Sequence, residues 1–180
     1  MKYYLVGILD SESYSQIEEI QKKISAKYDL YQDLPILHMT LEVIDNPQID
    51  KLISALDEII SGKSPFIIEV NGAICFEPPF KSVNLLINKD LKVMEFIKHI
   101  NNQLKLRGFS VRDDINAWDL HISLANNNFS TRKWSQAEYV SACTLVQSLN
   151  FKKSLIIESI ELWKPINDKN EMVLKSFSLN

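Results

Sequence analysis

Two stretches of this sequence follow one pattern, Leu37-His38-Met39-Thr40-Leu41 and Leu120-His121-Ile122-Ser123-Leu124. Each places a histidine and a hydroxyl residue two positions apart, with apolar residues between and around them. Because side chains of a β-strand alternate between its two faces, His38 and Thr40 would emerge together while their apolar neighbours point the other way. The second stretch would behave in the same manner. We therefore predict two strands, each anchored in a core by one face and presenting an imidazole and a hydroxyl on the other.

The sequence around these stretches alternates between strand-like and helix-like segments. Apolar residues that recur every three or four positions indicate helices, and short aliphatic or aromatic runs indicate strands. The order is strand, helix, histidine strand, helix, strand pair, followed by helix, histidine strand, helix, strand pair. We expect strands over 2–9, 36–44, 66–76, 83–87, 119–125, 155–163 and 172–177, and helices from the 10–13 cap region to 28 and over 46–61, 90–107 and 134–149.

The composition is that of an ordinary globular chain. It has 180 residues, of which 46% are hydrophobic and 24% are charged. A chain of this length fits one domain, and no stretch is rich enough in Pro, Gly or Ser to form a linker. We therefore expect residues 1–180 to form a single α+β domain of two pseudo-symmetric lobes, and the chain to be a monomer.

The charge balance limits the partners of the chain. The formal net charge is −3, whereas long nucleic acids are usually bound by clustered Lys and Arg. We expect no long nucleic acid partner, although a small phosphodiester or an RNA terminus needs only one or two local cations. The apolar run at 3–9 is too short for a signal or membrane segment, and we predict a cytoplasmic protein without membrane contact.

The two cysteines, Cys75 and Cys143, have no close partner in the sequence and no neighbouring histidine at metal-ligand spacing. Such isolated cysteines indicate neither a disulfide framework nor a zinc site. We predict that both are small core or surface residues.

The paired motifs suit one kind of chemistry. Substitution at a phosphodiester needs one group that takes a proton from the nucleophile and another that gives a proton to the leaving oxygen, and histidine titrates near the working pH. Thr40 and Ser123 could donate hydrogen bonds to the non-bridging phosphate oxygens. This arrangement requires no metal or other cofactor. The acidic residues at 113, 114 and 119 do not have a spacing that makes ligands converge on an ion with His121.

The paired H-x-[T/S] motifs resemble those of the 2H phosphoesterase superfamily, which includes the bacterial 2'-5' RNA ligase and cyclic phosphodiesterase enzymes. The resemblance extends over nearly the whole chain, from the opening strand through both motifs to the closing strand pair. It implies a bilobal α+β fold in which two antiparallel sheets line a central groove, with helices outside. It also implies metal-independent chemistry in which His38 and His121 are acid and base, and in which Thr40 and Ser123 are the phosphate-binding hydroxyls. The chain lacks the proline often found just before the second histidine of the family.

Other residues are weaker candidates, each with a structural alternative. Lys81, where relatives often carry a cation, is a candidate phosphate ligand or a solvated strand-end lysine. Trp118 is a candidate for substrate binding, by stacking on a base, or a packing residue, and Trp163 and Phe80 have the same two interpretations. His99 lies beside the apolar stripe of its helix and has no hydroxyl partner, which indicates a surface role. Three cations flank the second motif and could steer an anion or form a solvated cluster: Arg112, Arg132 and Lys133.

These observations lead to a function hypothesis with two alternatives. We expect a metal-independent phosphodiesterase that acts on a 2',3'-cyclic nucleotide phosphate, an RNA terminus or another small phosphodiester by two-histidine acid–base catalysis. The first alternative is a module that binds an RNA end or a nucleotide without turning it over. The second is 2'-5' RNA ligation, the reverse reaction under the same acid–base logic. The sequence does not say which histidine is the acid.

Overall fold

The computed structural model describes residues 1–180, which form seven strands and four helices. The elements follow the predicted order, so the α+β class is confirmed. Their bounds are β1 Lys2–Leu9, α1 Ser11–Tyr28, β2 His38–Asp45, α2 Ile49–Ile60, β3 Phe66–Phe76, β4 Ser82–Ile87, α3 Leu91–Leu106, β5 His121–Ala125, α4 Gln136–Ser148, β6 Lys152–Trp163 and β7 Val173–Ser178.

Side-chain caps fix the beginnings of three helices. The carboxylate of Asp10 accepts a hydrogen bond from the backbone of Ser13, and that of Asp90 accepts one from Val93. At α4 the cap is reciprocal, since Ser135 and Glu138 each bond the backbone of the other. These contacts satisfy N–H groups that the first helical turn leaves without a partner. None of the four helices combines the length and the hydrophobicity needed to cross a bilayer.

All seven strands belong to one antiparallel sheet, in the order β1-β2-β5-β4-β3-β6-β7, and β1 also pairs with β6. The expectation of two separate sheets is therefore wrong. The reason is the length of β6, whose first half pairs with β3 while its second half pairs with β1 and β7. On the opposite side, β2 and β5 meet at a single register pair, Met39 with Ile122. The two predicted lobes are joined at both places.

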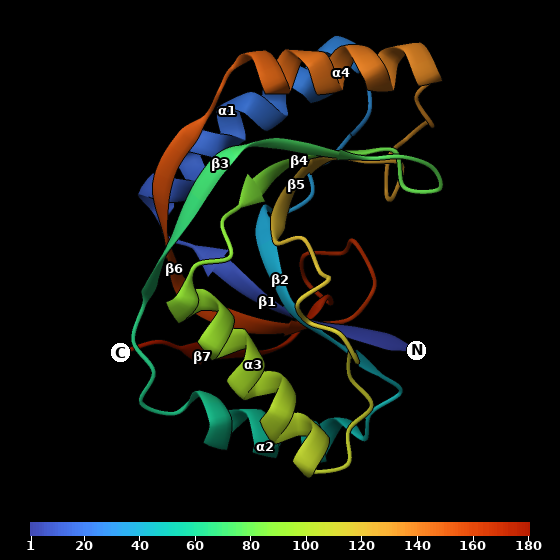
Figure 1. The fold of residues 1–180 in the computed structure, drawn as a ribbon. Helices are drawn as coiled ribbons and strands as arrows, with labels where there is room; N and C mark the ends of the chain where they lie inside the picture. Colours follow the sequence, from blue (N-terminus) through green and yellow to red (C-terminus); the bar gives the residue numbers. More distant parts are fainter.

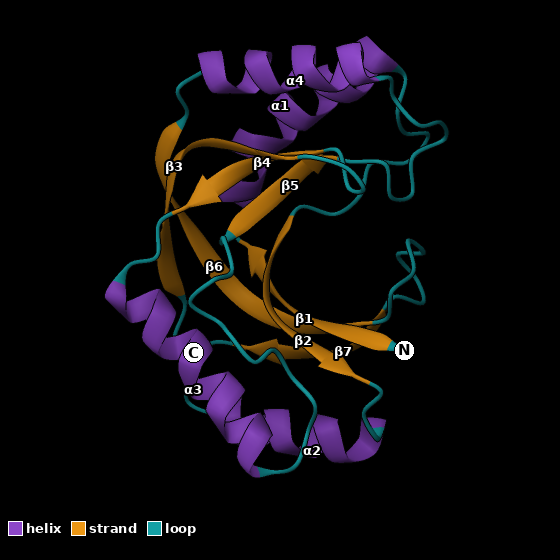
Figure 2. Ribbon diagram, turned by 45° about the vertical axis from the view of Figure 1, so that its right-hand side comes forward, coloured by secondary structure: helices purple, strands orange, loops and turns teal.

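The sheet curves strongly, and the helices lie outside the curve (Figures 1 and 2). Helices α1 and α4 cover β3, β4 and β5 at one end, whereas α2 and α3 cover β2 and β7 at the other. The main hydrophobic core lies between the sheet and these helices. Side chains on the other face of the strands point to the concave side. A second, smaller apolar cluster around Val6, Trp163 and Met172 lies there.

Candidate functional site

Both histidine motifs fold as predicted, in strands β2 and β5. Their apolar residues are buried, including Met39 and Ile122 at 0% exposure, and their histidines and hydroxyl residues are half-buried. The cross-strand partner of His38 on β1 is Ile8, which belongs to the edge of the small concave cluster. The alternation therefore directs the core residues toward the helices and both motif side chains toward the concave face.

The register brings the two motifs together. Met39 and Ile122 are antiparallel Cα partners, so His38 lies across from Ser123, and Thr40 lies across from His121. The two imidazoles thus occupy diagonal corners, which in a regular antiparallel pair are about 7–8 Å apart. A phosphate group placed between them would have one imidazole on each side and a hydroxyl next to each imidazole.

The two imidazoles are held by matching contacts. Nδ1 of His38 lies 2.7 Å from the carbonyl oxygen of Ile36, and Nδ1 of His121 lies 2.7 Å from that of Asp119. A carbonyl oxygen only accepts hydrogen bonds, so each Nδ1 carries the proton and donates it. In both rings this leaves Nε2 for a substrate, with its orientation fixed by the backbone two residues upstream.

An aromatic ring also packs edge-on against each imidazole. Trp163 lies 4.5 Å from His38 between ring centroids, and Phe76 lies 4.9 Å from His121. Phe76 was not predicted, because its neighbour across the sheet depends on the register of three strands, β3, β4 and β5. Strand alternation places Phe76 and Cys75 on opposite faces of β3, as in the structure, but does not say which residue Phe76 contacts.

Burial changes the acid–base properties of both histidines. Desolvation, together with the nearby His121, lowers the pKa of His38 to about 4, although the hydrogen bond to Ile36 opposes this shift. Desolvation also lowers the pKa of His121, but both the carbonyl and the carboxylate of Asp119 oppose this shift. The imidazolium form is therefore better supported at His121 than at His38.

The two hydroxyls lie beside the imidazoles. Ser123 accepts a hydrogen bond of 3.0 Å from the side-chain amide of Asn126, which orients its hydroxyl hydrogen away from that amide. Asn126 is in turn held by Tyr31, whose hydroxyl bonds its backbone in both directions. The sequence gives no signal for Asn126, since an asparagine after a strand is typical of turns.

A family model described as the AKAP7 2'5' RNA ligase-like domain matches residues 6–170. The chain belongs to this family. The resemblance to the 2H phosphoesterases is thus confirmed over nearly the full length of the chain. No curated protein sequence matches the chain significantly.

Solved structures with this fold include TT0787, LigT and a protein described as a phosphoesterase. TT0787 of Thermus thermophilus superposes with a TM-score of 0.66 at 16% identity, covering 99% of this chain and 98% of that chain. LigT of E. coli complexed with 3'-AMP gives a TM-score of 0.62 at 14% identity, covering 99% and 98%. A structure described as a phosphoesterase gives 0.59 at 13%, covering 99% and 98%. These similarities establish the fold.

Two of the aromatic residues that were candidates for stacking on a base pack against other side chains of the protein. Trp163 is buried at 5% exposure and packs against His38, so its ring cannot stack on a base. Trp118 stacks nearly parallel to His121, with centroids 6.2 Å apart and planes at 19°, and its ring also carries the guanidinium of Arg112 at 4.0 Å. Phe80, in the β3–β4 turn, is the candidate that stays exposed, at 57%.

Lys81 lies in the same turn, immediately before β4, with a left-handed backbone (φ 42°). Its carbonyl accepts a hydrogen bond of 3.0 Å from the indole of Trp134. No hydrogen bond or ion pair joins its ammonium to the motif residues, so its role as a phosphate ligand stays a prediction. His99 is exposed on α3, as predicted.

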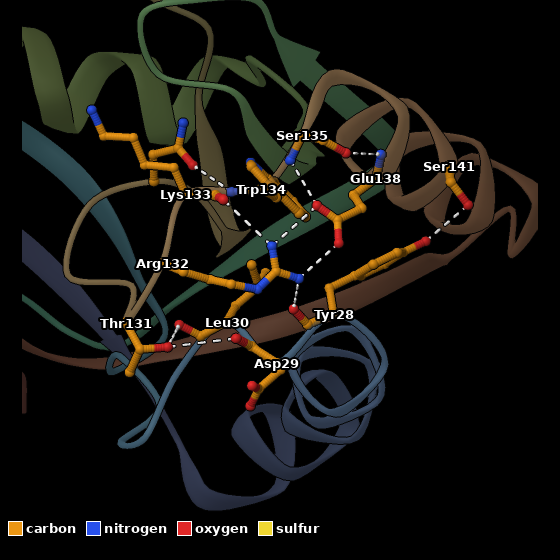
Figure 3. Close-up of polar contacts among 11 residues, drawn as sticks. Tyr28, Asp29, Leu30, Thr131, Arg132, Lys133, Trp134, Ser135, Glu138 and Ser141 are labelled. Atoms are coloured by element: carbon orange, nitrogen blue, oxygen red, sulfur yellow. Dashed lines mark hydrogen bonds and ion pairs between the residues drawn. The ribbon is translucent and has the colours of Figure 1, made fainter.

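Arg132 is committed to a structural contact rather than free to steer an anion (Figure 3). Its guanidinium donates to both carboxylate oxygens of Glu138, at 2.7 and 3.1 Å, and to the carbonyl of Tyr28 at the end of α1. The hydrogen bond with Arg132, together with the backbone of Ser135, lowers the pKa of Glu138 to about 2. Arg132 thus connects the end of α1 with the beginning of α4.

The prediction for the cysteines is wrong. Cys75 on β3 and Cys143 on α4 form a disulfide across 68 residues of sequence. Cys75 lies on the face of β3 that α4 covers, so the two side chains meet in the core layer. Sequence spacing gives no sign of this, because the contact depends on how the last helix packs against the sheet.

Proposed function

We propose that the chain is a metal-independent phosphodiesterase that opens a 2',3'-cyclic nucleotide phosphate or cleaves a related RNA-terminal or small phosphodiester. The observation that carries this proposal is the matched pair of motifs. Each of the two imidazoles donates a hydrogen bond from Nδ1 to a backbone carbonyl. The imidazoles lie diagonally across one register pair, each beside a hydroxyl. Both free Nε2 atoms belong to one face of the sheet, where a single phosphate can contact both.

The proposed reaction needs only these side chains and water. One imidazole Nε2 takes a proton from a water molecule as the water oxygen forms a bond to phosphorus. The bond from phosphorus to one ribose oxygen breaks, and the other imidazole gives its proton to that oxygen. Thr40 and Ser123 donate hydrogen bonds to the non-bridging oxygens as their charge grows. The product is a ribose phosphomonoester with a free neighbouring hydroxyl.

The electrostatics favour one assignment of roles in the hydrolytic direction. Burial and the neighbouring His121 hold the pKa of His38 at about 4, so His38 is neutral at physiological pH and suits the base. The carboxylate of Asp119 favours the charged form of His121, which suits the acid. The negative charge of a bound phosphodiester would favour the imidazolium further.

The class of substrate follows from charge and from the fold. The net charge of −3 disfavours a long nucleic acid, and two of the three cations that flank the second motif, Arg112 and Arg132, are engaged in ion pairs. LigT, which shares the fold, has been crystallised with 3'-AMP and with phosphate. We infer a substrate that presents one nucleotide or one RNA end.

A substrate panel in EDTA tests the proposal. It contains 2',3'-cyclic nucleotides, 2'-5' and 3'-5' linked dinucleotides and small cyclic phosphate esters, with products identified by chromatography. We expect turnover of at least one cyclic phosphate that EDTA leaves unchanged, and its loss in His38→Gln. The matched control is His99→Gln, which removes an exposed histidine and should keep wild-type activity.

Three outcomes would overturn the proposal. Binding of a cyclic nucleotide in calorimetry without any product would indicate a binding module. Joining of RNA ends without hydrolysis of any panel compound would indicate a ligase. Activity that EDTA abolishes and a divalent ion restores would contradict the metal-independent mechanism.

A further inference from the structure

The carboxylate of Glu42 is fully buried two residues beyond Thr40. Strand β2 carries a bulge at this point. Thr40 pairs with Val6 on β1, whereas Glu42, two residues further along β2, pairs with Leu5, the immediate neighbour of Val6. The extra residue, Leu41, changes the alternation and turns Glu42 toward the core. A buried carboxylate is costly unless it is paired and hydrogen-bonded.

Arg112 and Asn101 supply the partners of this carboxylate. Nε of Arg112 donates to Oε1 of Glu42 at 2.7 Å, and the side-chain amide of Asn101 donates to Oε2 at 2.7 Å. The same amide also donates to the carbonyl of Arg112. A second guanidinium nitrogen of Arg112 donates to the carbonyl of Leu41. The backbone N–H of Arg112 also donates to Oε1 of Glu42 at 3.4 Å, so Arg112 is fixed to the first histidine strand through both its side chain and its backbone.

The guanidinium of Arg112 continues this contact chain to the second histidine. Its central carbon lies 4.0 Å from the centroid of the Trp118 ring, and that ring stacks on His121. Nη1 of Arg112 is buried without a hydrogen-bond partner. The charge of the guanidinium lies over the indole, whose electron-rich ring attracts the cation.

These contacts lie where the backbone connection between the two motifs is weakest. β2 and β5 share one register pair, and the segment that leads from α3 to β5 is irregular between residues 107 and 120. Along this segment the isolated bridge between Asp45 and Ser110 is the only strand-like contact with β2. Side-chain contacts therefore act together with this single register pair in setting the angle between His38 and His121.

We propose that Arg112 is a positioning residue, which together with Trp118 sets the orientation of His121 relative to the first motif. This inference rests on the proposed function for its catalytic consequence. Glu42 anchors Arg112 to β2, Arg112 holds the Trp118 ring, and the ring supports the imidazole. This role is an alternative to the interpretation of Trp118 as a stacking platform for a base, because the ring already lies beside Arg112 and His121.

Other titratable groups lie near His121 and belong to the same environment. Asp119 lies two residues upstream and pairs with Lys89 at 3.5 Å. His38 faces it from β2. None of these groups is altered in the variants below, so a change at His121 can be assigned to Arg112 or Trp118.

The first test uses Arg112→Lys, which keeps a positive charge for Glu42 but loses the planar group over the ring. We expect kcat to fall on the order of tenfold with KM within about twofold, since misplacing a catalytic group lowers the rate of chemistry more than binding. The matched control is Arg107→Lys, an exposed arginine on the same segment that pairs with Glu58, and it should match wild type. Unchanged kcat in Arg112→Lys would overturn the proposal.

The second test changes Trp118 and so leaves the buried ion pair between Arg112 and Glu42 intact. Trp118→Phe keeps a ring and should keep most of the activity, whereas Trp118→Leu should lose kcat. A rise in KM for nucleotides at constant kcat in Trp118→Leu would show a base platform and contradict positioning.

A third readout is independent of activity. Histidine Cε1–Hε1 resonances, assigned with single histidine variants, are titrated by NMR in wild type, Arg112→Lys and Trp118→Leu. We expect the His121 midpoint to move in both variants and the His99 midpoint to stay. An unmoved His121 overturns the positioning role even if the panel shows no enzymatic activity, whereas a moved His121 in an inactive protein would contradict only the proposed function.

Discussion

At the scale of single residues, the two histidines combine a fixed tautomer with a disfavoured charge. Each Nδ1 donates to a carbonyl, and each ring lies against an aromatic side chain. The alternating pattern of the two motifs predicted which four side chains share a face, because strand alternation is a local rule. The pattern could not predict the hydrogen bonds from the imidazoles to backbone carbonyls. It also could not predict the aromatic partners, since Trp163 and Phe76 come from strands distant in sequence.

The lowered pKa of His38 predicts how stability depends on pH. Unfolded, His38 takes up a proton near pH 6.5; folded, it does so only near pH 4. Between these values the unfolded chain binds more protons, so the free energy of unfolding falls as the pH drops from about 6.5 to 4. Calorimetric melting at intervals over this range should show a shallower fall of Tm in His38→Gln than in wild type. Equal slopes in the two proteins, with His99→Gln as the reference, would contradict the buried neutral imidazole.

At the scale of elements, the disulfide joins β3 to α4 directly behind the second motif. Cys75 faces α4, and the next residue, Phe76, faces His121. Disulfides persist mainly in oxidising compartments, whereas the sequence predicted a cytoplasmic protein. The cytoplasmic compartment stays a prediction, and the oxidation state of Cys75 and Cys143 in the cell tests it.

Reduction of this disulfide should destabilise the fold. A crosslink that closes a loop of 68 residues lowers the entropy of the unfolded chain by an amount worth roughly 4 kcal/mol. Urea denaturation of wild type should therefore shift to a lower midpoint on addition of a reductant. The double variant Cys75→Ser/Cys143→Ser should start at the lower midpoint and not respond to reductant. A wild-type midpoint that the reductant leaves unchanged would show that the disulfide does not contribute to stability.

The boundaries of the elements show which signals the sequence carries. The Asp10 and Asp90 caps place the beginnings of α1 and α3 close to the expected positions. The beginning of β6 at Lys152 was missed by three residues, because its exposed polar residues are typical of a loop until they pair with β3. Pairing partners, unlike caps, are not local in sequence.

At the scale of the whole molecule, the curved sheet places both motifs on one concave face while the core and helices lie behind it. The sequence predicted the class and order of elements from periodicity. It did not predict one sheet in place of two, since that depends on a strand long enough to pair with both halves. The two motifs thus meet at the narrowest connection of the sheet, the single register pair between β2 and β5.

The pH dependence of kcat/KM for a 2',3'-cyclic nucleotide, in wild type, His38→Gln and His121→Gln, tests the two-histidine mechanism most directly. With a neutral base at His38 and a charged acid at His121, we expect a bell whose optimum lies on the acid side, between about pH 4 and 6.5. Each variant should lose at least about 100-fold in rate, together with one limb of the bell. A flat profile, or a variant that keeps wild-type kcat/KM within about threefold, would contradict the paired acid–base mechanism.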